Sequence, residues 1–435
     1  MLLTLFQTGE LRHYVVRLSK TVQYTLCANA EAITWGINVT ASKQVAWAPW
    51  LVIAAGIVAA MHIGKLPPTI PVLQQQLSLS LGQSGFLLAG IQVAGIVMAL
   101  FVGLMAEKIG LKRLQVGGLL ILAVASALGS FAHSFAALFA ARLLEGFGFL
   151  SIVLVAPSLI KQLVPASQLK PVLGFWAAYM GLGVAASLLL APNLLHVMTW
   201  PGVWWIYAIL ALVMALLLWR FVPNVRVQHH EAAPPLSQLL KQTLSHPAPW
   251  LLGVVFASYT SQWFAVTSFL PTIYANAQIA ATTAGVLTAL VCLSNVGGPI
   301  VAGMMLQHGR PAWLLFTSGF VLMMIGAVVA FAGEGVLPFA LQYGGVLLFS
   351  AGGGLIPGVV FAYVVYLAPS QQTVASTMGW VQQWSALGQF CLPPLMGNLV
   401  TWWGSWRNVW MVCVVLGVMG IASALQIQRL VKRMA

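Results

Sequence analysis

The stretch Gly103-Leu-Met-Ala-Glu107-Lys108-Ile-Gly110-Leu-Lys112-Arg113 is a short cationic break between two apolar runs, residues 82–106 and 111–132. A helix needs roughly 20 apolar residues to cross the hydrocarbon core of a bilayer, and both runs are long enough. Loops with an excess of lysine and arginine stay on the cytoplasmic side of a membrane. The stretch therefore predicts a tight cytoplasmic turn between two membrane-spanning helices.

Apolar runs of this length recur throughout the chain. Of its 435 residues 60% are hydrophobic and only 6% are charged. That is more apolar than a soluble domain of this size needs for one core, so most helices are expected to face lipid. Twelve runs can be delimited, at 47–73, 82–106, 111–132, 135–161, 171–193, 203–221, 248–273, 282–306, 312–332, 336–366, 372–399 and 406–428. The sequence thus predicts an all-α membrane protein with twelve transmembrane helices.

The longest polar break after the N-terminal region covers residues 223–247, which contain several prolines and charged residues. It predicts a cytoplasmic linker between two pseudo-symmetric six-helix bundles, 47–222 and 248–428. Residues 1–46 are interpreted as a cytoplasmic arm or as a start-site artefact, and residues 429–435 as a cytoplasmic tail.

Glycine pairs with the same spacing recur in the two predicted bundles. Gly174 and Gly183 lie in the fifth run, and Gly379 and Gly388 lie in the eleventh. Matched positions in matched order are the trace expected of a duplicated bundle.

The formal net charge of +13 reflects nineteen lysine and arginine residues against six acidic residues. These cations lie between the apolar runs rather than on one face, so they indicate membrane orientation instead of a nucleic-acid partner. With the N-terminus in the cytoplasm, all but Lys65, Arg142 and Arg407 lie on the cytoplasmic side. Arg407 is placed at the membrane interface. Lys65 and Arg142 lie at membrane depth, where an ionisable group is a functional candidate.

Arg142 belongs to the sequence Arg142-Leu-Leu-Glu145-Gly146-Phe-Gly148 in the fourth run, and Glu145 is the only carboxylate inside any run. Residues three apart lie on nearly the same face of a helix, so the two side chains are expected to meet. Burial favours the neutral form of a glutamate, whereas a neighbouring arginine favours the ionised form. A change of environment would therefore let Glu145 take up and release a proton. The alternative is a static ion pair that holds the bundle together.

His62 and Lys65 lie one turn apart in the first run, just before Pro67, Pro68 and Pro71. Interrupted helices near the membrane midplane commonly form substrate sites, because the broken backbone frees polar groups. His62 and Lys65 are therefore predicted to bind substrate together with Arg142 in a positively charged cavity. The alternative for Lys65 is that its ammonium reaches the membrane interface.

The second half offers neutral candidates for substrate binding. They are Tyr259, Gln262 and Trp263 in the seventh run, Asn295 in the eighth, and Trp380, Gln382 and Trp384 in the eleventh. Buried amides and indoles orient ligands, but they also bond helix to helix, and both roles remain open for each residue.

No cofactor or metal ion is expected. Cys27, Cys292, Cys391 and Cys413 have no metal-binding spacing and are interpreted as packing residues. The runs contain no phosphate-binding glycine loop, no paired carboxylates and no His-Glu-x-x-His. A membrane sensor or an embedded enzyme is therefore only a remote alternative.

The stretch from Gly103 to Arg113 resembles the signature loop of the major facilitator superfamily, and the sequence from Arg142 to Gly148 is similar to its fourth-helix signature. The resemblance covers nearly all of residues 47–428 and implies the two-bundle fold of that family. It also implies that Gly103, Glu107, Lys108, Gly110, Lys112 and Arg113 gate the cytoplasmic side. Glu107-Lys108 stands where the family usually has Asp-Arg, and the second-half copy is reduced to His308-Gly309-Arg310.

Shorter pieces are similar to the cyanate and nitroimidazole transporter branch of the superfamily. They are Pro157-Ser-Leu-Ile-Lys161, Gly174-Phe-Trp176-Ala-Ala-Tyr-Met-Gly181, and Phe269-Leu-Pro271 before Ala284-Gly285. The usual first-helix arginine of this branch has no clear match, since Lys65 is displaced from its position.

The leading hypothesis is a secondary active transporter of the cell inner membrane with both termini in the cytoplasm. It would move a small organic or inorganic anion by proton-coupled alternating access, with Glu145 as the proton carrier, and we expect it to be a monomer. The alternative within transport is proton-driven efflux of drug-like compounds.

Overall fold

The computed structural model describes residues 47–99, 109–165, 172–173, 175–176, 178–224, 235–370 and 373–434. Outside these residues lie the expected arm 1–46, the loop residues Gly103, Glu107 and Lys108, Gly174, and residues 225–234 of the predicted linker. The helices of the first half are α2 (Ala48–Gly64), α3 (Leu66–Leu77), α4 (Leu81–Ala89), the 3₁₀ turn η1 (Gly90–Gln92), α6 (Leu111–Gly129), α7 (Phe135–Val153), α8 (Ala156–Leu163), α10 (Tyr179–Val197) and α11 (Trp200–Phe221).

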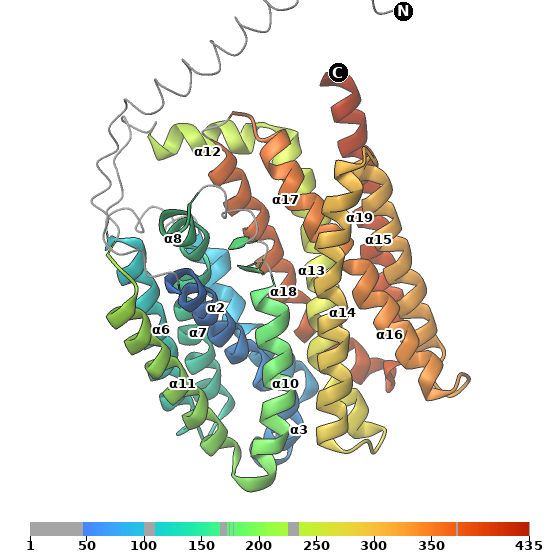
Figure 1. The fold of residues 1–435 in the computed structure, drawn as a ribbon. Coiled ribbons are helices and arrows are strands. Elements are labelled where there is room, and N and C mark those ends of the chain that lie inside the picture. The colour runs from blue at the N-terminus through green and yellow to red at the C-terminus, as the bar shows by residue number, and fades with distance from the viewer. Residues whose placement is uncertain are drawn as a thin grey trace, which may run out of the picture. The chain divides into compact units, whose positions relative to one another are not determined.

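The second half follows α12 (Leu236–Ser245). Its helices are α13 (Pro247–Asn276), α14 (Ala281–Gln307), α15 (Ala312–Ala327), the π-helical turn η2 (Val328–Ala332), α16 (Phe339–Gly353), α17 (Leu355–Leu367), α18 (Val374–Trp403), the 3₁₀ turn η4 (Trp406–Asn408) and α19 (Val409–Met434). Figure 1 shows α12 lying across one end of the helices, the end at which α19 also finishes.

Ten segments of the described chain are long and apolar enough to cross a membrane. The helices α13 and α18 have 30 residues each and correspond to the seventh and eleventh predicted runs. They are less apolar because they carry many hydroxyl and amide side chains. In α13 most of these, including Ser258, Gln262 and Ser268, are buried among other helices rather than turned to lipid. Ten segments and these two helices together match the twelve predicted runs, with ends that differ by several residues.

The first span is broken at Lys65, the single residue between α2 and α3. Pro67 and Pro68 have no N–H to continue the hydrogen bonds of α2, but they are tolerated in the first turn of α3. The α3 helix ends at Ser78, which adopts a left-handed conformation with φ of 51°. The next helix begins at once with a capping box between Ser80 and Gln83. The proline-rich sequence thus places Lys65 at a helix break.

Two of the repeated glycines occupy equivalent places in the two halves. Gly183 on α10 packs against α2, where an added Cβ would come within 2.6 Å of Ala60 Cβ. Gly388 on α18 packs against α13, where an added Cβ would come within 3.0 Å of Ser261 Cβ. In each half the fifth span therefore lies against the first through a glycine, as expected of a repeated bundle.

The halves contact one another chiefly through α4 with α18 and through α10 with α14. These contacts are tight. A Cβ on Gly85 would approach the nitrogen of Pro394 to 2.6 Å, and a Cβ on Gly285 would approach Pro192 Cγ to 2.9 Å. At Gly85 and at Gly285 the helices of the two halves are in direct contact, which leaves no room for a solute at these two points.

Candidate functional site: a buried charge cluster beside a cavity between the halves

Arg142 and Glu145 lie on α7, with 1% and 0% of their surfaces exposed. Their expected pairing is present: Arg142 Nη1 donates to Glu145 Oε2 at 2.5 Å. The same nitrogen donates to the carbonyl of His62 at 2.8 Å, and Arg142 Nε donates to the carbonyl of Leu87 at 3.3 Å. Arg142 therefore connects three spans of the first half. A guanidinium with several fixed donors suits this role better than a lysine ammonium.

The side chain of Lys65 extends from the helix break to Oε1, the other oxygen of the Glu145 carboxylate. Its Nζ lies 2.5 Å from Glu145 Oε1 and donates to Ser126 Oγ at 2.7 Å. The ammonium also lies 4.6 Å from the centre of the Trp204 ring, within the range of a cation–π contact. Lys65 is fully buried, so its side chain does not reach the membrane interface.

His62 completes the cluster. Its Nδ1 lies 3.3 Å from Glu145 Oε1 and 3.4 Å from Lys65 Nζ. Behind it, Ser187 on α10 donates to the carbonyl of Met61 at 3.0 Å and forms a short hydrogen bond with Tyr207 on α11. The structure thus brings together the four ionisable residues of the first half that the sequence predicted to bind substrate or to carry the proton. The neutral groups around them, Ser126, Ser187, Trp204 and Tyr207, carried no pattern in the sequence that pointed to this site.

The charges of the cluster do not cancel. Lys65 and Arg142 contribute two positive charges and Glu145 one negative charge, so with neutral His62 the sum is +1. Burying unpaired charge is costly unless a further partner is supplied. Two buried donors or acceptors, Arg142 Nη2 and His62 Nε2, have no hydrogen-bond partner among the described residues. The cluster therefore has unused hydrogen-bonding capacity at these two atoms.

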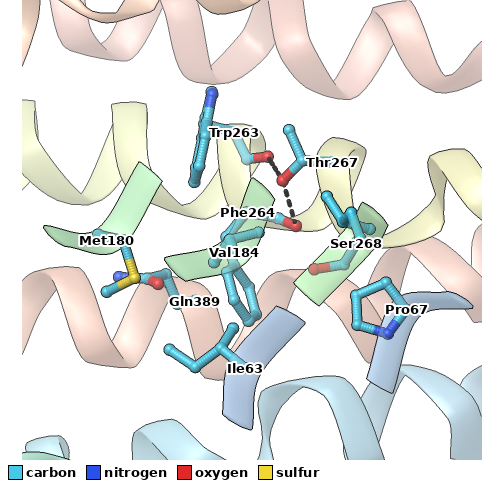
Figure 2. A pocket seen from close by; sticks show the side chains of 10 residues that line it. Ile63, Pro67, Met180, Val184, Trp263, Phe264, Thr267, Ser268 and Gln389 are labelled. Atoms are coloured by element: carbon cyan, nitrogen blue, oxygen red, sulfur yellow. Dashed lines mark hydrogen bonds between the residues drawn. The ribbon is translucent and has the colours of Figure 1, made fainter. Parts of the chain in front are cut away.

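A small cavity of about 40 Å³ lies between the halves (Figure 2). The first half lines it with Ile63, Pro67, Met180, Val184 and Leu188, and the second half lines it with Trp263, Phe264, Thr267, Ser268 and Gln389. Such a volume holds a few water molecules, whereas sites for drug-sized ligands measure roughly 300–1,000 Å³. As it stands, the cavity is too small for a drug-sized ligand.

The cavity and the charge cluster are neighbours through the helix break. Ile63 and Pro67 line the cavity on either side of Lys65, while the Lys65 ammonium is held inside the first half by Glu145. Lys65, Arg142, Glu145 and His62 do not themselves line the cavity in this conformation. Moving the break between α2 and α3 would change the separation between the cavity and the charges.

Three of the predicted residues of the seventh and eighth runs, Tyr259, Trp263 and Asn295, belong to one hydrogen-bond network. Tyr259 donates to Asn295 Oδ1 at 2.9 Å, and Asn295 Nδ2 donates to the carbonyl of Ser350 at 2.7 Å. Trp263 Nε1 donates to Ser350 Oγ at 2.9 Å, and Trp263 also lines the cavity. Gln262 is buried and donates to the carbonyl of Ser258 at 2.7 Å. Of this group, Trp263 has a place at the cavity.

The predicted residues of the eleventh run lie away from the cavity lining. Trp380 and Trp384 pack edge to face against Trp250, with ring centres 4.8 Å and 6.0 Å apart, and Gln382 is exposed. The residue of this run that lines the cavity is Gln389, one helical turn beyond Ser385. The sequence carried no signal that α18 meets the first half at Gln389.

Of the predicted gating loop, the structure describes Gly110, Lys112 and Arg113. Gly110 has a φ of 92°, a conformation that glycine adopts without strain, and it immediately precedes α6. Among the described residues, neither Lys112 nor Arg113 forms an ion pair. Their gating role stays a prediction.

Comparison with known proteins agrees with this arrangement of helices. The family model of the Major Facilitator Superfamily matches residues 52–386. The chain is 24% identical over 301 residues to the uncharacterized MFS-type transporter YceJ of Bacillus subtilis (68% of this chain, 72% of the relative). It is 27% identical over 265 residues to the cyanate transport protein CynX of Escherichia coli (60% and 66%) and 27% identical over 315 residues to the 3-(3-hydroxy-phenyl)propionate transporter of the same species (69% and 74%).

A solved structure has the same fold. It is the crystal structure of a bacterial homologue of the human lysosomal transporter Spinster in an inward-facing, unoccupied conformation, which superposes with a TM-score of 0.67 at 14% identity over 88% of this chain and 95% of that chain. The predicted fold class is thereby confirmed. The family match confirms the prediction that the chain is a transporter rather than an enzyme. Because the family model covers well over half of the sequence, the chain belongs to the Major Facilitator Superfamily and is a multi-pass membrane transporter of small solutes.

Proposed function

We propose that this transporter carries a small anion together with protons by alternating access. The observation that carries the proposal is the buried cluster in which Lys65 and Arg142 share the single carboxylate of Glu145. The cluster is net positive, and Arg142 Nη2 has no partner among the described residues. Such a site favours a negatively charged solute, because the second cation lacks a counter-charge.

Protonation of Glu145 is the step that links the anion to the proton. A neutral Glu145 no longer compensates either cation, so the charge of the cluster rises from +1 to +2 and its attraction for an anion increases. When the anion leaves, the two cations again favour the ionised carboxylate and the proton is released. Loading of both solutes on one side and release of both on the other would produce symport.

Movement of the halves would connect the cluster to the solute. The first half (residues 47–222) would rock against the second half (residues 248–428) about the cavity, with 223–247 as the linker. The break at Lys65 gives α3 freedom to move relative to α2, since no continuous helix joins them. We place both termini in the cytoplasm, the protein in the cell inner membrane, and the unit of function in the monomer.

The relatives support an anionic solute. Their names specify cyanate, 3-(3-hydroxy-phenyl)propionate and, for a probable antiporter of Thermus thermophilus that is 26% identical over 227 residues, nitrate and nitrite. All of these solutes are anions near neutral pH. They differ in size and polarity, so they support the charge of the solute rather than its identity.

Efflux of drug-like compounds is a second candidate, favoured by the apolar side chains of Ile63, Val184, Leu188 and Phe264 around the cavity. A cationic drug would need a free carboxylate. Glu145 is already bound through both oxygens, to Lys65 and Arg142, which is why anion uptake takes precedence. Increased drug tolerance of cells that express the wild-type protein, lost in Arg142→Ala, would favour efflux instead.

The test is solute accumulation in proteoliposomes with an inward proton gradient, using labelled cyanate, nitrate and 3-(3-hydroxyphenyl)propionate. We expect the wild type to accumulate at least one of these anions, and Glu145→Gln to lose accumulation while still equilibrating the anion down its own gradient. Glu334→Gln is the matched control, because Glu334 is an exposed carboxylate that bonds Ser405. Full accumulation by Glu145→Gln would show that the cluster is a static ion pair without a role in proton coupling.

A further inference from the structure

Gln389 links the cavity to the interface between the halves through a chain of side-chain hydrogen bonds. Its Oε1 accepts from Gln92 Nε2 at 2.9 Å, a bond that crosses from the second half to the first. Its Nε2 donates to Ser385 Oγ at 2.9 Å, and Ser385 donates to Thr260 Oγ1 on α13 at 3.0 Å. Figure 2 shows Gln389 among the side chains that line the cavity.

Both ends of the cross-half bond lie where their helices are irregular. Gln92 is the last residue of η1, a 3₁₀ turn in the middle of the second span, and such turns often mark hinges. On α18, Pro393 and Pro394 have no N–H to donate to the carbonyls of Gln389 and Phe390, so the helix is weakened just after Gln389. Small movements at this point would therefore change the bond without unfolding either helix.

The turn η1 also contacts the charge cluster. Arg142 Nε bonds the carbonyl of Leu87, and an added Cβ on Gly90 would come within 3.3 Å of Arg142 Cβ. Gly146 packs directly on Ile91, where an added Cβ would lie 3.2 Å from the Ile91 Cα. The part of α7 around Arg142 therefore packs directly against η1, the turn that ends at Gln92.

We infer that Gln389 is a specificity-determining residue that donates a hydrogen bond to an oxygen of the solute, and that Gln92 is the positioning residue that orients its amide. This inference rests on the proposed function for the charge of the solute. A primary amide has two N–H donors, and Gln389 Nε2 uses one of them within the described residues, for Ser385. With Oε1 held by Gln92, the amide cannot turn, and the second N–H is available to a carboxylate or other oxygen acceptor.

The small cavity makes the hydrogen bond between Gln92 and Gln389 sensitive to whether a solute is bound. About 40 Å³ is too small for an organic anion, so a bound solute requires the cavity walls to separate. One wall belongs to the first half and the other, with Gln389, to the second. Wall separation therefore acts on the Gln92–Gln389 bond. Gln389 stays oriented while its Oε1 accepts from Gln92, and its Nε2 donates separately to the solute oxygen.

The experiment measures binding to purified full-length protein by quenching of tryptophan fluorescence, since Trp263 lines the cavity. The probes are cyanate, nitrate, 3-(3-hydroxyphenyl)propionate and its uncharged amide. The variants are Gln389→Met and Gln92→Met, which remove the amides at similar length. Gln383→Met is the matched control, because Gln383 also crosses between the halves, to the carbonyl of Ile96 at 3.1 Å, without lining the cavity.

We expect Gln389→Met to weaken binding of the preferred probe about tenfold, Gln92→Met to weaken it severalfold, and Gln383→Met to leave it within about twofold. Equal affinities in Gln389→Met and Gln383→Met would overturn the inference and leave the proposed function standing. If the wild type binds the uncharged amide more tightly than the acid, the proposal that the solute is an anion is wrong. The effect of Gln389→Met on binding of the amide would then still test the role of Gln389. Failure of the wild type to bind any probe would contradict both.

Discussion

Lys65 and Glu145 lie 80 positions apart in the chain, yet Lys65 Nζ lies 2.5 Å from Glu145 Oε1 in the interior of the first half, with both side chains fully buried. The contact depends on the helix break at Lys65, which directs the lysine away from the neighbouring cavity and towards α7. The carboxylate that holds Lys65 also holds Arg142. A change in the protonation of Glu145 therefore acts on both cations at once.

Removing the lysine charge is expected to impair binding of the anion. Lys65→Met keeps the length of the side chain but lowers the charge of the cluster from +1 to zero, so the apparent affinity for the anion should fall about tenfold or more. The measurement is the concentration dependence of uptake into proteoliposomes. Lys241→Met, which removes an exposed cation from α12, should leave the affinity unchanged; an equal loss in both variants would argue for a nonspecific effect of charge.

Neutralising the carboxylate is expected to destabilise the fold. Glu145→Gln leaves Lys65 and Arg142 buried without their counter-charge, and breaking a buried ion pair typically costs about 3–5 kcal/mol. The double variant Lys65→Met/Glu145→Gln removes one of the two stranded cations and should recover part of the loss. Thermal unfolding in detergent would show this as a higher midpoint for the double variant than for Glu145→Gln. A lower midpoint would contradict the assignment of Lys65 as a partner of Glu145.

The repeated glycine of the fifth span is expected to be intolerant of larger side chains. In Gly183→Val the new Cβ would meet Ala60 at 2.6 Å, so α10 must move away from α2, and overpacking of this kind typically costs about 1–3 kcal/mol. Gly117→Val is the control, since an added Cβ on Gly117 has no neighbour within 4 Å among the described residues. Thermal stability should fall in Gly183→Val alone. Equal stability of the two variants would contradict the close packing of these helices.

Alternating access requires the tight contact between α4 and α18 to open. A Cβ on Gly82 would lie 3.0 Å from Asn398 Cγ, so cysteines at these two positions are close enough to form a disulfide. In a background without Cys391, oxidation of Gly82→Cys/Asn398→Cys should stop transport, and reduction should restore it. Each single cysteine variant should be insensitive to oxidation. Undiminished transport by the fully oxidised double variant would show that this end of the interface does not open.

The helices could be predicted from the sequence because membrane spans are long, apolar and separated by charged turns. Even α13 and α18, the two most polar spans, were recognised as runs, since their hydroxyl and amide groups are interspersed with enough apolar residues. The helix α12 was not distinguished from the linker, because its 10 residues are too few for a span and all but its four leucines are polar. The amphipathic pattern that places it across the end of the bundle extends over less than three turns.

The cluster could be predicted in part. His62, Lys65, Arg142 and Glu145 stood out because ionisable residues are rare at membrane depth, and the i, i+3 spacing of Arg142 and Glu145 required only a helix. The contact of Glu145 with Lys65 depends on how α7 packs against the break between α2 and α3, which no local pattern encodes. The cavity presented the same difficulty. Gln389, Thr267 and Met180 come from three helices of two halves, and only the packing of the halves brings them together.

The central claim is that the anion and the proton move together through the state of Glu145. The most direct measurement uses proteoliposomes loaded with a pH-sensitive dye and given an inward gradient of the transported anion, without any initial pH difference. Symport through Glu145 predicts that the anion gradient acidifies the interior with the wild type and with Glu334→Gln, but not with Glu145→Gln. Acidification by Glu145→Gln at the wild-type rate, or anion entry into wild-type vesicles with no acidification, would contradict the claim.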